Sequence, residues 1–186
     1  MQGLNDAIQN GGSTLANYGL SLQEVTSLIT AANSSIQDPK RVGTGLKAIA
    51  TNLAGLTTSA KDGSIHLNKT AKSLKEIAGI DVFADKEQTK VKSMTQILDE
   101  LNGKWDTLSD AQQKALSNSI AGKTQSNIFN SLMSNWDTYK KMMSEFDQGM
   151  QFGSANKEME NQLTSIEGRL NSLKVNNNAS YVQKCA

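Results

Sequence analysis

The side chains that could do chemistry in this chain are few and stand apart in the sequence. His66 is the only histidine and Cys185 the only cysteine, so together they cannot supply the ligands of a usual zinc site. The residues beside His66 form no recognisable catalytic constellation, and we expect His66 to lie in a surface loop. Asp99 and Glu100 are adjacent on a predicted helix, so their carboxylates point in different directions. The sequence therefore predicts no enzyme activity, no catalytic residue, no cofactor and no metal site.

Two further motifs have both a chemical and a structural interpretation. Gly43 and Gly45 precede Lys47, but the stretch lacks the Gly-x-x-x-x-Gly-Lys-Ser/Thr spacing of a phosphate-binding loop. We interpret these glycines as points of close helix packing. Trp105 and Trp136 could stack on nucleic-acid bases or anchor an interface. Because only 5% of the residues are aromatic, we expect the two tryptophans to be core or inter-helix anchors.

Composition and charge narrow the class of protein further. Hydrophobic residues make up 37% of the chain, below the roughly 45–50% of ordinary globular domains, so we expect a core of small side chains and modest stability. The 19 basic and 18 acidic residues give a net charge of +1, which argues against strong binding to nucleic acid or anionic membranes. No apolar run reaches the roughly 20 residues that a membrane span needs, so we predict no span in this segment.

The elements that must position these residues are predicted to be helices. Capping boxes of the type Ser-x-x-Glu/Gln begin at Ser21, Ser93 and Ser109, each ahead of apolar residues at helical spacing. Asp38 and Pro39 read as an N-cap followed by proline at the first helical position, where its missing N–H is not needed. These signals predict several short helices joined by turns.

Glycines are predicted to hinge or pack these helices. Two capped helices meet in the segment 120–125, where Gly122 ends the first of them. Gly79 follows an apolar stripe and is placed to act as a helix C-cap. The complete set of predicted hinge or packing glycines is Gly43, Gly45, Gly79, Gly122 and Gly153.

The C-terminal part of the chain carries the most regular apolar pattern. Five apolar residues step by 4-3-4-3, the heptad spacing of a coiled-coil seam or a long bundle helix. They are Met159, Leu163, Ile166, Leu170 and Leu173. We expect this heptad stripe to be a self-association face, which would make the chain its own partner in a homo-oligomer.

Together these patterns predict an all-α fold, a multi-helix bundle of short helices with a longer C-terminal heptad-like helix. We divide the chain into four parts: a helical or flexible lead at 1–20, a helical core region at 21–148, a long helix suited to a coiled coil at 149–174 and a flexible polar tail at 175–186. Residues 80–83 suit a short extended segment but are too few to indicate a sheet, and the charged residues 85–92 are predicted to form a solvated loop.

Four pieces of the sequence, taken in order, resemble the core region of the tape-measure proteins of long-tailed phages. The order and spacing of the pieces carry the resemblance, which covers roughly residues 20–174. The pieces are Gly43–Lys47 followed by Leu53; Leu74–Phe83 followed by Ile97–Leu101; Leu108–Gln113 followed by Ile120–Gln125 and Phe129; and Gly153–Ala155 with Glu158.

The resemblance implies a structural role in the virion tail of a phage or prophage. A tape-measure protein lies inside the tail tube, sets tail length during assembly in the bacterial host cytoplasm and leaves at infection, so tail tube and tail assembly proteins are the implied partners. Members of the family are usually far longer, and we therefore expect a fragment, a truncated prophage product or an excised domain. The alternative is a free-standing helical protein-binding or adaptor module, which would share these caps and stripes. Neighbouring tail genes would favour the phage interpretation.

Overall fold

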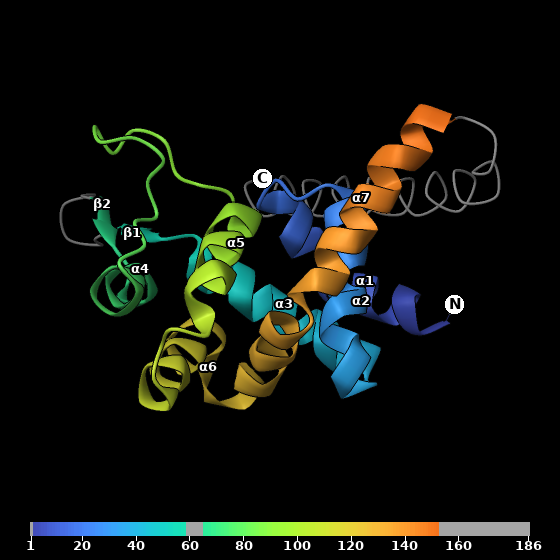
Figure 1. Cartoon of the computed structure of the whole chain (residues 1–186), viewed down its shortest axis with the longest axis horizontal. Coiled ribbons are helices and arrows are strands. Elements are labelled where there is room, and N and C mark those ends of the chain that lie inside the picture. Colours follow the sequence, from blue (N-terminus) through green and yellow to red (C-terminus); the bar gives the residue numbers. More distant parts are fainter. Residues whose placement is uncertain (1, 59–64, 153–186) are drawn as a thin grey trace, which may run out of the picture.

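A computed structural model describes residues 2–58 and 65–152 of the chain and shows an all-α fold, as the sequence predicts (Figure 1). The helices pack into one bundle, and a short two-stranded ribbon lies with α4 at one end of it. The elements are α1 (Gln2–Asn17), α2 (Leu22–Ile36), α3 (Pro39–Leu53), β1 (Leu56–Thr58), β2 (Ile65–Leu67), α4 (Lys69–Ser73), the π-helical turn η1 (Leu74–Ala78), α5 (Met94–Trp105), α6 (Asp110–Ser134) and α7 (Trp136–Phe152).

The helix starts that the sequence predicts are confirmed. Ser21, Ser93 and Ser109 each cap a helix, and in each case the side chain three residues later returns to the backbone N–H of the serine. The side chain of Asp38 accepts a hydrogen bond from the backbone of α3, and Pro39 occupies the first turn. These caps satisfy backbone donors that no helical carbonyl can reach, so each start is fixed by residues within one turn of it.

The short strands β1 and β2 are an addition to the predicted fold. They pair antiparallel, with Leu56 opposite Leu67 and Thr57 opposite His66. The helical stretch that leads to Gly79 therefore begins after Leu67, at α4. Residues 80–92 form a loop in which the backbone N–H groups of Thr89 and Lys90 donate to the Asp85 carboxylate, and Phe83 forms an isolated bridge with Val91.

Helices α1 and α3 approach each other closely because small residues line their contact. A Cβ added to Gly43 of α3 would overlap the backbone carbonyl of Ala7 in α1, and one added to Gly11 would overlap the carbonyl of Gly43. Gly3 meets the ring of Pro39 in the same way at the start of α3. The segment predicted as a helical or flexible lead thus contains a helix whose small residues lie directly on the backbone of α3.

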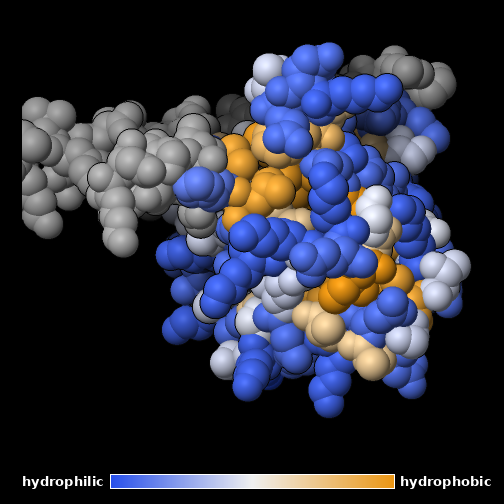
Figure 2. Space-filling model, turned by 90° about the vertical axis from the view of Figure 1, so that its left-hand side faces the viewer, coloured by the Kyte–Doolittle hydropathy of each residue, from blue (hydrophilic) through white to orange (hydrophobic). Residues whose placement is uncertain are grey.

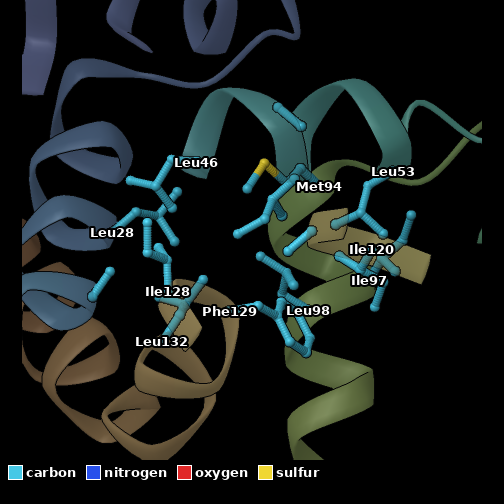
Figure 3. Packing of buried hydrophobic residues seen from close by; sticks show 14 of the residues in the cluster. Leu28, Leu46, Leu53, Met94, Ile97, Leu98, Ile120, Ile128, Phe129 and Leu132 are labelled. Atoms are coloured by element: carbon cyan, nitrogen blue, oxygen red, sulfur yellow. The ribbon is translucent and has the colours of Figure 1, made fainter. Parts of the chain in front are cut away.

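The core is a single cluster of buried aliphatic side chains with a few aromatic ones (Figure 3). Helix α6 contributes to it from both sides of a kink, with Leu116 and Ile120 before the kink and Phe129 and Leu132 after it, all completely buried. In a straight helix of 3.6 residues per turn these two pairs would face directions about half a turn apart. The kink therefore lets both halves of α6 bury their apolar side chains in one core.

The surface is mixed in character. Tyr18, at 39%, is the only large hydrophobic residue that is exposed within the described parts of the chain. The face in Figure 2 shows limited apolar areas separated by hydrophilic side chains. Helix α7 extends away from the bundle in its second half (Figure 1). Over the ranges that the structure describes, no helix combines the length and the hydrophobicity that crossing a bilayer would require.

Candidate functional site: the kinked helix α6 and its supports

The most unusual backbone in the described structure is the kink at Gly122 in α6. Its dihedral angles, φ 74° and ψ 162°, lie far from helical values although the chain is helical on both sides. This combination of angles is essentially restricted to glycine, because a Cβ would collide with the backbone. No atom outside the immediate chain lies within 4 Å of the place where a Gly122 Cβ would stand. The requirement for glycine here is therefore conformational and does not come from crowding.

Two carbonyl groups next to the kink are held by side chains from other helices. A helix break leaves carbonyls in the preceding turn without their helical N–H partners. Asn52 of α3 donates its Nδ2 to the Ile120 carbonyl at 2.8 Å, and the Thr70 hydroxyl of α4 donates to the Ser119 carbonyl at 2.8 Å. Asn68 donates its Nδ2 to the Asn52 carbonyl at 2.7 Å and so continues the chain of contacts toward α4. We call Gly122, Asn52 and Thr70 the α6 hinge.

A groove of about 450 Å³ lies between the two halves of α6. Its walls include Asp110 and Ser134, the first and last residues of the helix, so the kink brings the ends of α6 to one groove. The polar walls are partly paired with each other, since the Ser117 hydroxyl lies 2.6 Å from Oδ1 of Asn130. Trp105 lines the groove and packs edge-on against Phe129, with ring centroids 5.5 Å apart.

The tryptophans anchor helices, as predicted. Trp136 is 1% exposed and stacks on Tyr139 with ring centroids 4.4 Å apart. Its indole Nε1 donates to Oδ1 of Asp99 at 2.8 Å, and Lys140 forms an ion pair with the same carboxylate at 3.3 Å. The indole hydrogen bond, the largest cause, and Lys140 lower the pKa of Asp99 below its ordinary value, against an opposing effect of burial. Asp99 therefore joins α5 to α7.

The other residues that the sequence singled out lie apart from the α6 hinge or outside the described residues. Gly45 lies against Ile128 of α6, because a Cβ there would stand 2.5 Å from Cδ1 of Ile128. Gly79 ends η1 in the left-handed conformation, with φ 62°. His66 is exposed in β2. Gly153 and the whole heptad stripe from Met159 to Leu173 lie outside the described residues.

Within residues 2–58 and 65–152, no cluster of three or more His, Cys, Asp or Glu side chains is placed to hold a metal ion. Sequence reasoning missed Gly11, Asn52 and Thr70. The helical spacing of Gly3, Ala7 and Gly11 could have signalled a close contact on α1, whereas no local pattern marks Asn52 or Thr70 as partners of α6.

Comparison with known proteins agrees with a structural role. Residues 1–122 match the family described as phage-related minor tail protein, so the match covers about two thirds of the 186-residue chain. No solved structure matches the chain. Because the family match spans α1 through the first half of α6, the packed glycines of α3 and the helical supports of the hinge lie within it. The chain belongs to the family of phage-related minor tail proteins.

Proposed function

We propose that this chain is a segment of a tape-measure protein, which sets tail length during tail assembly from inside the tail tube. The supporting observation is the match to phage-related minor tail proteins, on a chain whose described part is a helical scaffold. Tail tube and tail assembly proteins are the partners in this proposal. Assembly takes place in the cytoplasm of a bacterial host, and the finished protein resides in the virion tail.

A molecular ruler works through its contour length, and helices give this chain a defined length per residue. A helix rises about 1.5 Å per residue, so 186 residues in continuous helix would span at most roughly 280 Å. A compact domain of the same size has a radius of gyration of about 16 Å. The extended and compact forms therefore differ greatly in the length that they would contribute.

In the proposal, the bundle opens into extended helices when it is confined in the tube. The character of the core supports this idea, because buried alanines such as Ala7, Ala31, Ala32 and Ala50 contribute little apolar area. Glycines lie at the contacts of α3 with α1 and α6, where they leave no side chain to bury. Separating these helices exposes less apolar surface than separating helices that meet through leucines.

The proposal that this chain sets tail length can be tested by measuring the tails of a phage that carries it. Deleting residues 154–174 removes 21 residues and should shorten the tails by about 32 Å if that segment is helical. The matched control is Thr164→Asp with Asn171→Asp, which changes the same segment beside the heptad stripe without changing its length. Tails that shorten in the deletion and keep their length in the control support the proposal. Tails of unchanged length in the deletion contradict it.

Self-association through the heptad stripe is part of the same proposal. Two aspartates on one stripe place charges in the seam, where a partner helix would have to desolvate them. Leu163→Asp with Leu170→Asp should therefore reduce the sedimentation coefficient of the purified chain to that of a monomer. Thr164→Asp with Asn171→Asp adds the same charge beside the stripe and should leave sedimentation unchanged. If the stripe variant sediments like the parent chain, the stripe does not mediate association.

A further inference from the structure

The kink in α6 joins two helical segments that follow each other without an intervening loop. The residues on both sides are helical, the kink rests on one glycine, and Figure 1 shows the two segments at a clear angle. With Gly122 in helical dihedral angles, α6 would be a continuous helix of 25 residues. Its backbone hydrogen bonds would then be complete, because the carbonyls before the kink would regain helical N–H partners.

We propose that the α6 hinge is a latch: Asn52 and Thr70 hold α6 bent, and α6 becomes one straight helix when α3 and α4 separate from it. Each latch residue donates to a carbonyl that the straight helix would use itself, at Ile120 and Ser119 respectively. In the bent form these two side chains therefore supply donors to carbonyls whose helical N–H partners the kink removes. Because the contacts come from residues 68 and 49 positions away, they exist only while the bundle is assembled.

Burial links the latch to the rest of the bundle. Leu116 and Ile120 lie in the same core as Phe129 and Leu132 only because α6 is bent. Straightening would turn the two pairs to nearly opposite sides, so one pair would have to leave the core. The straight form is thus excluded in the closed bundle and becomes favourable once the bundle opens. The latch rests on the proposed function, because it describes how α6 changes shape when the bundle opens in the tube. Its release can nevertheless be measured in the purified chain.

The distance between the ends of α6 reports its shape. Asp110 and Ser134 line one groove in the bent form, whereas Ala111 and Ser134 would stand about 35 Å apart along a straight helix. Both Ala111 and Ser134 are exposed, so spin labels on Ala111→Cys and Ser134→Cys, with Cys185→Ser, should leave the core undisturbed. Pulsed electron spin resonance, with circular dichroism on the same samples, then gives distance and helix content across a urea series.

The latch is tested with Asn52→Ala and Thr70→Val together, and with Gly122→Ala. Near the onset of unfolding, removing two hydrogen bonds should raise the ratio of long to short distances roughly tenfold over the parent. Gly122→Ala should also populate a narrow distance near 35 Å, the length of the straight helix, with helix content retained, because alanine disfavours the bent dihedral angles. Thr26→Val, a change on α2 away from the hinge, should not alter the ratio.

Two results would overturn the latch. One is a short distance in both hinge variants throughout the range where helix content is retained, which would show that packing alone bends α6. The other is a broad distribution that accompanies loss of helix, which would show that release melts α6. Neither result depends on tail length, so failure of the latch and failure of the ruler are separate outcomes.

Discussion

The close contact between α1 and α3 predicts that one added methyl group, the Cβ of alanine in place of Gly43, destabilises the fold. Gly43 lies in the interior of α3, and a Cβ there would overlap the backbone carbonyl of Ala7. Gly103 lies in α5 and is exposed, with nothing within 4 Å of its added Cβ. Replacing glycine by alanine should stabilise the helical conformation by about 1 kcal/mol at either position. Only at Gly43 must a neighbouring backbone move, and overpacking of this kind costs about 1–3 kcal/mol or more.

The two Gly→Ala substitutions should therefore change stability in opposite directions. Because a backbone carbonyl yields less readily than a side-chain end, we place the packing cost at Gly43 near 3 kcal/mol, which leaves a net destabilisation of about 2 kcal/mol. Gly103→Ala should stabilise the chain by about 0.5–1 kcal/mol. With a urea m-value of about 2 kcal/mol/M, the midpoint should fall by roughly 1 M for Gly43→Ala and rise slightly for Gly103→Ala.

Urea unfolding followed by far-ultraviolet circular dichroism measures both changes, and an m-value equal to that of the parent chain shows that midpoints can be compared. If Gly43→Ala raises the midpoint as Gly103→Ala does, then α1 can move away from α3 without loss. The close contact of the two helices would then contribute nothing to stability, and the reasoning from small residues would be wrong.

Three further measurements address other parts of the structure. The lowered pKa of Asp99 means that its contribution to stability is present above the ordinary aspartate pKa and is lost as pH falls through the folded pKa. Asp99→Ala should therefore destabilise the chain by about 1 kcal/mol or less at pH 7 and by progressively less as the pH falls below the ordinary aspartate pKa, as measured by urea midpoints at neutral and acid pH. Burial raises the pKa of Tyr139 to about 12, so its contribution is complete below pH 10 and is lost as pH rises through 12; Tyr139→Phe should weaken the fall in stability over that interval, and an identical alkaline profile would refute the assignment. The free energy of unfolding of the parent chain should lie below about 10 kcal/mol, and a clearly higher value would contradict easy opening of the bundle.

Much of the fold could be read from residues that lie close together in the sequence. The capping boxes at Ser21, Ser93 and Ser109 and the proline start at Pro39 all occur where predicted, because a cap joins residues within a single turn. The all-α class follows from the same local signals together with apolar residues at helical spacing. The position of the kink in α6 was also accessible, since Gly122 falls between two capped apolar stripes.

Other features depend on residues far apart in the sequence and had no local signal. The pairing of β1 with β2 was missed because two three-residue strands carry too little pattern. The break between α6 and α7 at Asn135 was missed as well. Two side-chain amides donate to backbone carbonyls beside this break: Asn102 donates to the Met133 carbonyl, and Asn135 donates to the Ser131 carbonyl. The contact from Asn102 forms only after the chain has folded back on itself.

The sequence by itself determined where helices begin, where glycine permits a bend, and the lack of an evident group for chemistry. Tertiary structure decided which glycines touch a neighbouring backbone, as Gly11 and Gly43 do, and which polar side chains hold the bend in α6. The division has a physical cause. Caps and helical stripes are interactions over three or four residues, whereas the Asn52 and Thr70 contacts span 68 and 49 residues and exist only in the assembled bundle.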